Sequence, residues 1–447
     1  MQFIKTLTFT NEYKSFLNLG NIFFLAGIFF LPSALPLGAF FLLSSIIISF
    51  CISKENFLQN KFNLILFLCL FFIIFSTIYS CILNPSQSLL NFDKSIIWLN
   101  LFNWLPIYFI FIGSQIYMKS EKQRLLFQKV LIAGTIPVIV SCIMQKFFNI
   151  YGPFETLFGT IVWFNYKNSA EQVSGLFNNP NYLGMWFTLC LPFSLSALKL
   201  EKNNLVNSII MSLINIFIIY FAFATFSRNA ILGIVLSFLL IIDRRKLIIF
   251  SFSFIVSLIV FIYVLPNLSN IFQIYFSDLS EAHILKKFSS LQLSSENPRI
   301  AIWSNALNLI SMRPFFGWGA GSFPHVFYEN AFLKIPLPKY QHSHNLIIEL
   351  AYNFGIPITC CIVCTIFNIF IKTFKKVNSL NKSLSKYLIY KPLLASFSIF
   401  LIAHLTDITY YDGKISILFS LLLAGLKNIL DENIESKNTY QVQIQSK

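Results

Sequence analysis

The chain has 447 residues, of which 56% are hydrophobic and only 11% are charged. Its mean hydropathy of +0.69 is too high for a water-soluble globular protein and indicates a polytopic membrane protein. The net charge of +15 is compatible with nucleic-acid binding, but the basic residues occur in short clusters between apolar segments. The positive-inside rule explains this distribution, so we expect no nucleic-acid partner.

Apolar segments long enough to span a bilayer recur along almost the whole chain. Pro32 and Pro36 divide the first apolar stretch into two helices, because proline interrupts a helix. The first helix leads directly into further spans, so we expect an anchor and not a cleaved signal peptide. The sequence predicts a single all-α membrane domain over residues 1–447, with about twelve transmembrane helices at 15–33, 36–53, 62–82, 95–117, 125–147, 181–200, 206–224, 225–242, 246–265, 346–372, 387–409 and 414–429.

Lysine and arginine are unevenly distributed between the two sides of this predicted bundle. With the N-terminus inside, most of them fall on the inner side. The short outer loops carry only Lys94, Lys146, Lys167, Arg228 and Lys414. This bias predicts that both termini are cytoplasmic.

Two connections, 148–180 and 266–345, are then long and external. A loop of about eighty residues in a compact protein is usually functional or disordered. Aromatic residues argue against disorder in the second loop, which contains Trp303, Phe315, Phe316, Trp318, Phe323, Phe327 and Tyr328. We therefore predict that 266–345 is a partly helical subdomain inserted between the ninth and tenth spans.

All the histidines fall on or near the outer face in this topology: His283, His325, His342, His344 and His404. The segment His342-Ser343-His344-Asn345 lies where the long outer loop returns to an apolar span. A neutral imidazole at a water–membrane boundary can accept a proton from a hydroxyl near pH 7. The alternative is that either histidine is an ordinary loop residue beside a helix end.

Three arginines are predicted to lie outside, where the insertion rule gives no reason for them. Arg228 is at the outer edge of a span, where it either snorkels to the interface or binds an anion. Arg299 follows Asn297-Pro298, which predicts a helix start. Free N–H groups and a guanidinium at that start favour a phosphate site over an ordinary solvated arginine. The third, Arg313, precedes a glycine-rich turn.

Two further motifs are interpreted as turns. The glycines of Gly317-x-Gly319-x-Gly321 do not follow a strand, which excludes a dinucleotide-binding motif and predicts a tight turn near a ligand or a neighbouring helix. Gly175–Asn181 is typical of a turn that leads into a capped helix. No metal site is predicted, because His342-x-His344 has no carboxylate nearby in the sequence to serve as a third ligand.

The order of these motifs resembles the O-antigen ligase/polymerase family of bacterial envelope proteins over about residues 175–360. The motifs that carry the resemblance are Ser227-Arg228, Arg299 with Trp303, Pro314-x-x-Gly317-x-Gly319, and His344-Asn345 with Gly355 after nine residues. The resemblance implies a GT-C-like glycosyltransferase that moves a glycan from a polyprenyl diphosphate to a hydroxyl of a lipid or glycan acceptor. It also implies a site on the periplasmic face of the bacterial inner membrane, without a metal, cofactor or nucleotide sugar.

The resemblance also assigns residues. His344 matches the presumed catalytic histidine, and Arg228 and Arg299 match the arginines thought to hold the diphosphate. We expect the substrate to be bound in addition by His342, Asn345, Trp303 and Arg313. The ligase signature prefers Gly, Thr or Tyr where this chain has Ile358, so ligase and polymerase remain open.

Two other functional classes are alternatives. A transporter places ionisable groups near the bilayer midplane, often in repeated halves. Most predicted spans have no charge at their centres, and no internal repeat is visible; only His404 and Asp407, late in the eleventh predicted span, are candidates. The third class is a non-catalytic partner in glycan assembly.

The predicted orientation is testable by cysteine labelling. S290C and I335C are expected to react with a membrane-impermeant thiol reagent added from outside, because both lie in the predicted outer loop, whereas N378C is expected to be protected. Labelling of N378C from outside would reverse the orientation and move the whole candidate site to the cytoplasm.

Overall fold

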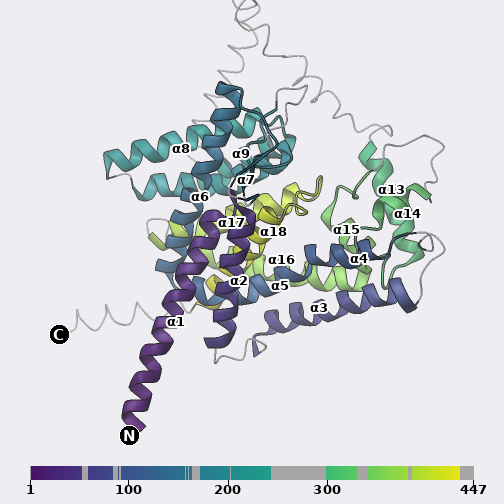
Figure 1. Ribbon diagram of the computed structural model, residues 1–447, viewed down its shortest axis with the longest axis horizontal. Coiled ribbons are helices and arrows are strands. Elements are labelled where there is room, and N and C mark those ends of the chain that lie inside the picture. Colours follow the sequence, from purple (N-terminus) through teal and green to yellow (C-terminus); the bar gives the residue numbers. More distant parts are fainter. Residues whose placement is uncertain are drawn as a thin grey trace, which may run out of the picture.

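The computed structural model describes residues 2–52, 59–83, 89, 92–156, 158–159, 161–163, 172–201, 203–242, 298–329, 340–380 and 385–432. It has the predicted all-α polytopic architecture (Figure 1). Among these residues, nine helices are long and apolar enough to cross a membrane, and two further apolar helices are shorter. The predicted span 246–265 lies outside the described residues, so the total of about twelve spans stays a prediction.

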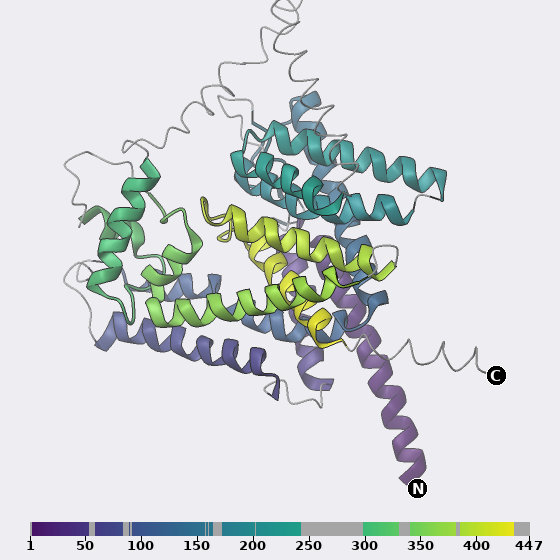
Figure 2. The same cartoon turned by 180° about the vertical axis from the view of Figure 1, so that it is seen from behind.

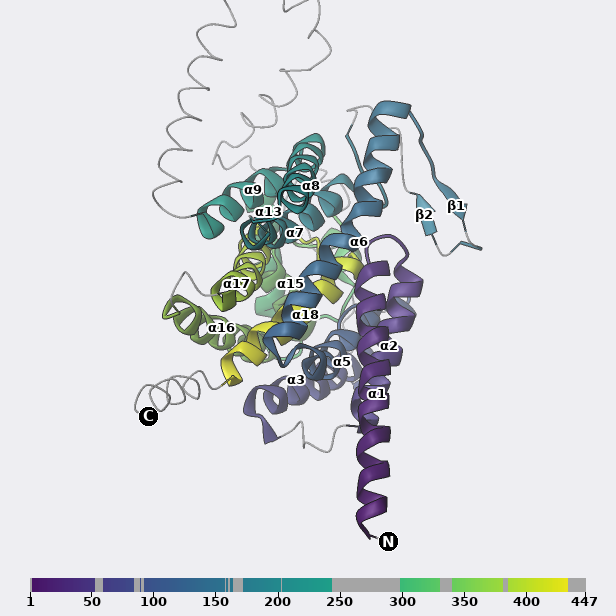
Figure 3. The same ribbon diagram turned by 90° about the vertical axis from the view of Figure 1, so that its left-hand side faces the viewer.

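The helices before residue 243 are α1 (Gln2–Phe30), α2 (Leu35–Ile52), α3 (Lys61–Ile78), α4 (Ser95–Asn100), α5 (Leu105–Ser114), α6 (Glu121–Phe148), α7 (Pro180–Leu200), α8 (Leu205–Ala224) and α9 (Arg228–Ile241). The later helices are α13 (Pro298–Met312), α14 (Phe323–Glu329), α15 (Leu346–Phe354), α16 (Ile356–Asn378), α17 (Ser385–Ala403) and α18 (Gly413–Asp431). A short antiparallel hairpin, β1 (Phe154–Thr156) and β2 (Ile161–Trp163), follows α6 (Figure 3).

The first two helices form the predicted hairpin around Pro32 and Pro36. They lie side by side (Figure 3). The approach is close at Gly38, where a Cβ atom would lie 2.8 Å from the Cα atom of Leu31. A larger residue at that position would push the two helices apart.

Helices α7 and α18 are the most buried spans among those described, with 78% and 83% of their apolar windows inside the protein. Helix α7 packs against α8, α9 and α17. Its first turn touches the segment before α9, since a Cβ atom on Gly184 would lie 2.9 Å from Thr225 Oγ1 and 3.3 Å from the Cβ atom of Ser227. Packing against α7 therefore positions the start of α9, which carries Arg228.

The predicted span 346–372 is interrupted, and in this respect the prediction was wrong. Gly355 has a φ of +91° and separates α15 from α16. The glycine-rich segment after α13 docks at this break: Trp318 N donates to Tyr352 O at 2.8 Å, and Ile356 N donates to Pro314 O at 2.7 Å. These contacts confirm the predicted tight turn next to a helix. They satisfy backbone groups that the break exposes.

The predicted span 387–409 is also too long. Helix α17 ends at Ala403, and residues 404–412 form a loop before α18. Polar side chains stabilise this loop; Asp412, for example, caps α18 by accepting from Lys414 N at 2.9 Å. His404 and Asp407, the candidates for a transporter site, consequently lie outside the span.

The described part of the long predicted loop contains the helices α13 and α14. Helices α13, α14 and α15 gather at one end of the molecule, away from α8 (Figures 1 and 2). A separate hydrophobic cluster holds them together, and it includes Ile302, Ala306, Trp318, Phe323 and Val326 with Ile97 of α4 and Tyr352 of α15. The described part of the loop is thus fixed to the membrane domain through α4 and α15.

Gly355→Ala is expected to destabilise the protein. The new Cβ atom would lie 2.1 Å from Phe315 O, and the positive φ is unfavourable for alanine. We expect a loss of about 1–3 kcal/mol or more, measured as a lower melting temperature in detergent. Gly413→Ala is the matched control, because its nearest neighbour is the flexible Leu35 side chain at 3.3 Å. Equal melting temperatures for the two variants would contradict this account of the break.

Candidate functional site

The site is built around residues 342–345, which lead into α15. The side chain of Asn345 caps this helix, because its Oδ1 accepts from Ile347 N at 3.0 Å and from Ile348 N at 3.2 Å. Its Nδ2 donates to Leu405 O at 3.0 Å, and Leu346 N donates to His404 O at 2.9 Å. The asparagine predicted to bind substrate therefore joins this loop to the loop after α17.

Ser343, at the centre of this loop, is completely buried and held on both sides of its backbone. Its N–H donates to Glu349 Oε2 at 2.9 Å, and its carbonyl accepts from Trp303 Nε1 at 2.9 Å. Trp303, also predicted to bind substrate, thus ties α13 to the histidine loop. Because the peptide is fixed at both ends, the two flanking imidazoles have defined positions.

His344 and Asp407 form a hydrogen-bonded pair. His344 has a φ of +56°, a conformation that is uncommon outside glycine, and its Nδ1 lies 3.0 Å from Asp407 Oδ1. A carboxylate can only accept, so the proton of the neutral imidazole lies on Nδ1. The Nε2 atom then keeps its lone pair and can act as a base. The side chains are 26% and 14% exposed, so both reach the surface of the protein.

His342 lies directly beside this pair. The two imidazole ring centres are 4.3 Å apart, and His342 Nδ1 accepts from the backbone N–H of His344 at 3.2 Å. Burial, together with the neighbouring His344, lowers the pKa of His342 to about 4. His342 is therefore neutral at physiological pH and supports the backbone turn at His344.

The Asp407 carboxylate is buried, which by itself would raise its pKa. The hydrogen bond from His344 and the positive charge of Arg299 act in the other direction, and the resulting pKa lies below its usual value. Asp407 Oδ1 also accepts from Ile408 N at 3.0 Å. The carboxylate is thus held ionised beside the imidazole.

Arg228 and Arg299 come together from the first turns of α9 and α13. Burial lowers the pKa of Arg299, Asp407 opposes this effect, and the positive charge of Arg228 adds to it. The two guanidinium groups are therefore close enough to repel each other. The side chain of Ser227, the N-cap of α9, makes no capping hydrogen bond.

Asn229 fixes the position of Arg228 relative to the Asp407 loop. Its Oδ1 accepts from Thr406 Oγ1 at 3.1 Å, and its Nδ2 lies 3.4 Å from Ala403 O. The structure therefore gathers Arg228, Arg299, His342, His344 and Asp407 from four separate segments of the chain. Helix α13 begins at Pro298, as the Asn-Pro pair predicts, and this start places Arg299 in the cluster.

Arg313 is not part of this cluster. It follows the last residue of α13, roughly 20 Å along the helix axis from Arg299. Its guanidinium lies over the ring of Trp318, 5.0 Å from the ring centre. Its position suits the packing of the glycine-rich turn and not the binding of a ligand shared with Arg299.

Glu349 is a buried carboxylate that sequence reasoning did not identify. Besides Ser343 N, it accepts from the hydroxyl of Tyr411 at 2.6 Å, and the Tyr411 ring lies 5.9 Å from the His342 ring. Glu349 was the only acidic residue in the predicted span 346–372. An ionisable residue within an apparent span is itself a signal of a functional region.

A carboxylate lies near the two histidines in the folded protein, contrary to the expectation from the sequence. No carboxylate is close to His342 and His344 in the sequence, but Asp407 is close in space. One potential ligand atom from each of these three residues lies within 4.8 Å of the others. The fold therefore brings a carboxylate to the two histidines, although none is near them in the sequence.

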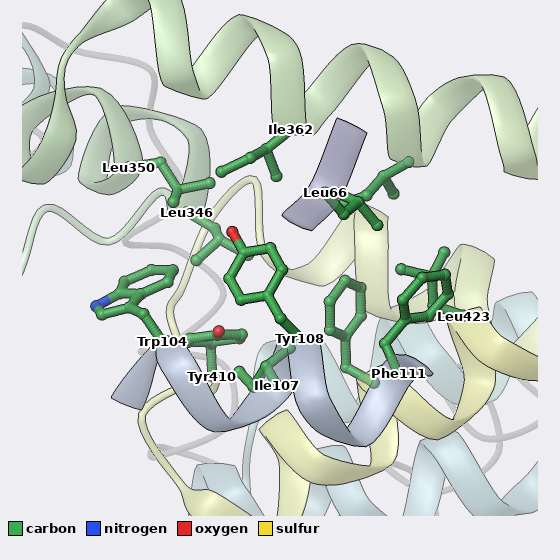
Figure 4. A pocket seen from close by; sticks show the side chains of 12 residues that line it. Leu66, Trp104, Ile107, Tyr108, Phe111, Leu346, Leu350, Ile362, Tyr410 and Leu423 are labelled. Carbon is green, nitrogen blue, oxygen red and sulfur yellow. The ribbon is translucent and has the colours of Figure 1, made fainter. Parts of the chain in front are cut away.

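An apolar pocket lies next to the histidine loop, on the side of α15 that faces α5 and α16 (Figure 4). Its empty volume is about 510 Å³, part of which is open to the surroundings. Leu346 and Leu350 of α15 line it together with Trp104, Tyr108 and Tyr410. The lining is almost entirely hydrocarbon, which favours an apolar occupant over a sugar.

The chain was compared with known protein families and with curated proteins. No curated protein matches it. The family model described as O-antigen ligase matches residues 213–363, which include Arg228, Arg299 and the histidine loop. Asp407 lies outside the matched range. The match supports a role in glycan assembly in general. The expected resemblance to the O-antigen ligase family is confirmed over residues 213–363.

Proposed function

We propose that this protein is a glycosyltransferase that moves a glycan from a polyprenyl diphosphate to an acceptor hydroxyl, on the periplasmic face of the bacterial inner membrane. The acceptor is a lipid-linked core for a ligase or a growing glycan for a polymerase. The observation that carries the proposal is the His344–Asp407 pair next to two mutually repelling arginines. This arrangement provides a base and an anion site side by side.

The leaving group fits the two arginines. A diphosphate brings at least two negative charges, which would relieve the repulsion between Arg228 and Arg299. Guanidinium groups bind phosphate oxygens through paired hydrogen bonds. Two of them at the leaving group would stabilise the charge that develops as the glycosidic bond breaks.

The base fits His344. Its Nε2 takes the proton of the acceptor hydroxyl while the hydroxyl oxygen attacks the anomeric carbon. The bond from that carbon to the diphosphate oxygen breaks, and the electron pair leaves with the diphosphate. Asp407 stabilises the resulting imidazolium. A single in-line displacement of this kind inverts the anomeric configuration.

The apolar pocket beside α15 suits a hydrocarbon chain (Figure 4). One of its lining residues, Leu346, directly follows the capping residue Asn345, so the pocket lies beside the histidine loop. A lipid chain in the pocket would bring its polar head toward the histidine loop. Positioning of this kind supplies much of the rate enhancement when the leaving group is already good.

The proposed base is tested by replacing each histidine. His344→Ala should lower the transfer rate on the order of 10²–10⁴-fold, the usual effect of a positioned acid–base group, and should leave donor binding largely unchanged. The measurement is an in vitro transfer assay with separate donor-binding measurements, at matched protein levels. His342→Ala is the matched comparison. If His342→Ala were inactive and His344→Ala active, the base would be the other histidine.

The proposed anion site is tested by Arg299→Lys. An ammonium cannot reproduce the forked contact with phosphate oxygens, so donor affinity should fall roughly ten- to a hundredfold. Turnover should fall as well. Arg313→Lys, at the other end of α13, is the comparison for effects on folding of this helix. An equal loss in both variants would argue that α13 matters for packing and not for the diphosphate.

A deletion strain distinguishes the two acceptors. Shortened envelope polysaccharide would indicate a polymerase, and unattached polysaccharide of normal length would indicate a ligase. Unchanged polysaccharide would contradict both.

A further inference from the structure

His342, His344 and Asp407 together have the composition of a metal site. One ligand atom from each lies within 4.8 Å of the other two, and His344 Nδ1 is 3.0 Å from Asp407 Oδ1. Two imidazoles and one carboxylate are preferred by zinc and its neighbours in the first transition row. Magnesium and calcium prefer oxygen ligands throughout. The donor set therefore selects for a zinc-class ion.

The three ligands are held in place before any ion arrives. They come from two loops, 340–345 and 404–412, which Asn345 joins through Leu405 O and Leu346 joins through His404 O. The Ser343 peptide between the two histidines is fixed by Glu349 and Trp303. With metal–ligand bonds of about 2 Å, neighbouring ligand atoms should be roughly 3–4 Å apart. The upper limit of 4.8 Å on the distances between these ligand atoms is close to that separation.

We propose that these three residues bind a zinc-class divalent ion and that the bound ion inhibits glycan transfer. Binding by itself does not depend on the proposed function, whereas the inhibition rests on it. The reason for inhibition is the position of one proton. Without the ion, Asp407 holds the imidazole proton on Nδ1 and Nε2 is the base.

An ion that coordinates Nδ1 takes the lone pair needed at that atom, so the proton of the neutral ring moves to Nε2. The ring gains and loses no proton overall. Asp407 changes from hydrogen-bond acceptor to metal ligand. Because Nε2 now carries the proton, it can no longer accept one from the acceptor hydroxyl. The ion and the transfer reaction thus compete for the same imidazole.

Binding is tested on the purified full chain with its affinity tag removed and after EDTA treatment. Cobalt(II) is the probe, since its visible absorption reports coordination by nitrogen and oxygen ligands. We expect one equivalent to bind, to be displaced by zinc and to resist excess magnesium. His342→Ala and Asp407→Asn should lose this absorption.

His325→Ala is the matched control for binding. His325 Nε2 also lies near a carboxylate, 3.2 Å from Glu329 Oε1, but this pair belongs to no three-ligand group among the described residues. The variant should keep the cobalt absorption of the unmodified chain. Absence of one-equivalent binding in the unmodified chain, or loss of it in His325→Ala alone, would overturn the proposed site.

Inhibition is tested in the transfer assay. EDTA-treated protein should be fully active, and saturating zinc should lower its rate to that of His344→Ala, a loss on the order of 10²–10⁴-fold. Zinc should have no further effect on His344→Ala. Loss of activity in EDTA that zinc restores would show a catalytic ion and overturn the inhibition. Unchanged activity with zinc bound would overturn it too.

These outcomes separate the two proposals. If His344→Ala is as active as the unmodified chain, the proposed base is wrong, but cobalt binding still tests the site. If His344→Ala is inactive and cobalt does not bind, the proposed function stands and the metal site does not.

Discussion

The site depends on the junction between two loops that are distant in the sequence. Asn345 and Leu405 are 60 residues apart and are joined by one side-chain hydrogen bond, and the His344–Asp407 contact lies beside it. Helices α15, α16 and α17 lie between these loops in the chain, so the chain must fold back before the two loops meet. Once they meet, the carboxylate fixes the tautomer of the imidazole. The chemistry of the site is therefore a product of helix packing.

Hydrogen bonds in the junction hold the residues around His344 in place. Glu349 and Trp303 hold the Ser343 peptide, and this peptide holds His344 in a left-handed conformation. A residue in such a conformation persists only where its surroundings impose it. The surrounding hydrogen bonds thus offset the unfavourable backbone conformation that orients the His344 imidazole. Such strained residues are common at functional sites.

Two guanidinium groups and one ionised carboxylate lie close together in the cluster. Arg228 and Arg299 repel each other, and Asp407 is shared between Arg299 and His344. An excess of positive charge at a membrane boundary is costly unless a partner neutralises it. On the proposed function, the diphosphate is that partner. A cation bound by His342, His344 and Asp407 would add positive charge to the cluster, whereas the diphosphate adds negative charge. The metal proposal is therefore linked to donor binding.

The sequence by itself determined the all-α polytopic membrane architecture, because hydropathy depends on composition along the chain. It also determined local features whose signals are local: the start of α13 at Pro298, the capped start of α7 at Asn179-Pro180, and the turn at Gly317. It located His344, Arg228 and Arg299, since motif order is a property of the sequence.

Only the tertiary structure decided which of these residues meet. Asp407 looked like part of a span, and its role depends on α17 ending at Ala403. Arg313 looked equivalent to Arg299, but the length of α13 separates them. Trp303 and Asn345 looked like substrate ligands, and their hydrogen bonds hold the loops. Hydrogen bonds and charge interactions act over a few ångströms in space, and a spacing along the chain does not specify such distances.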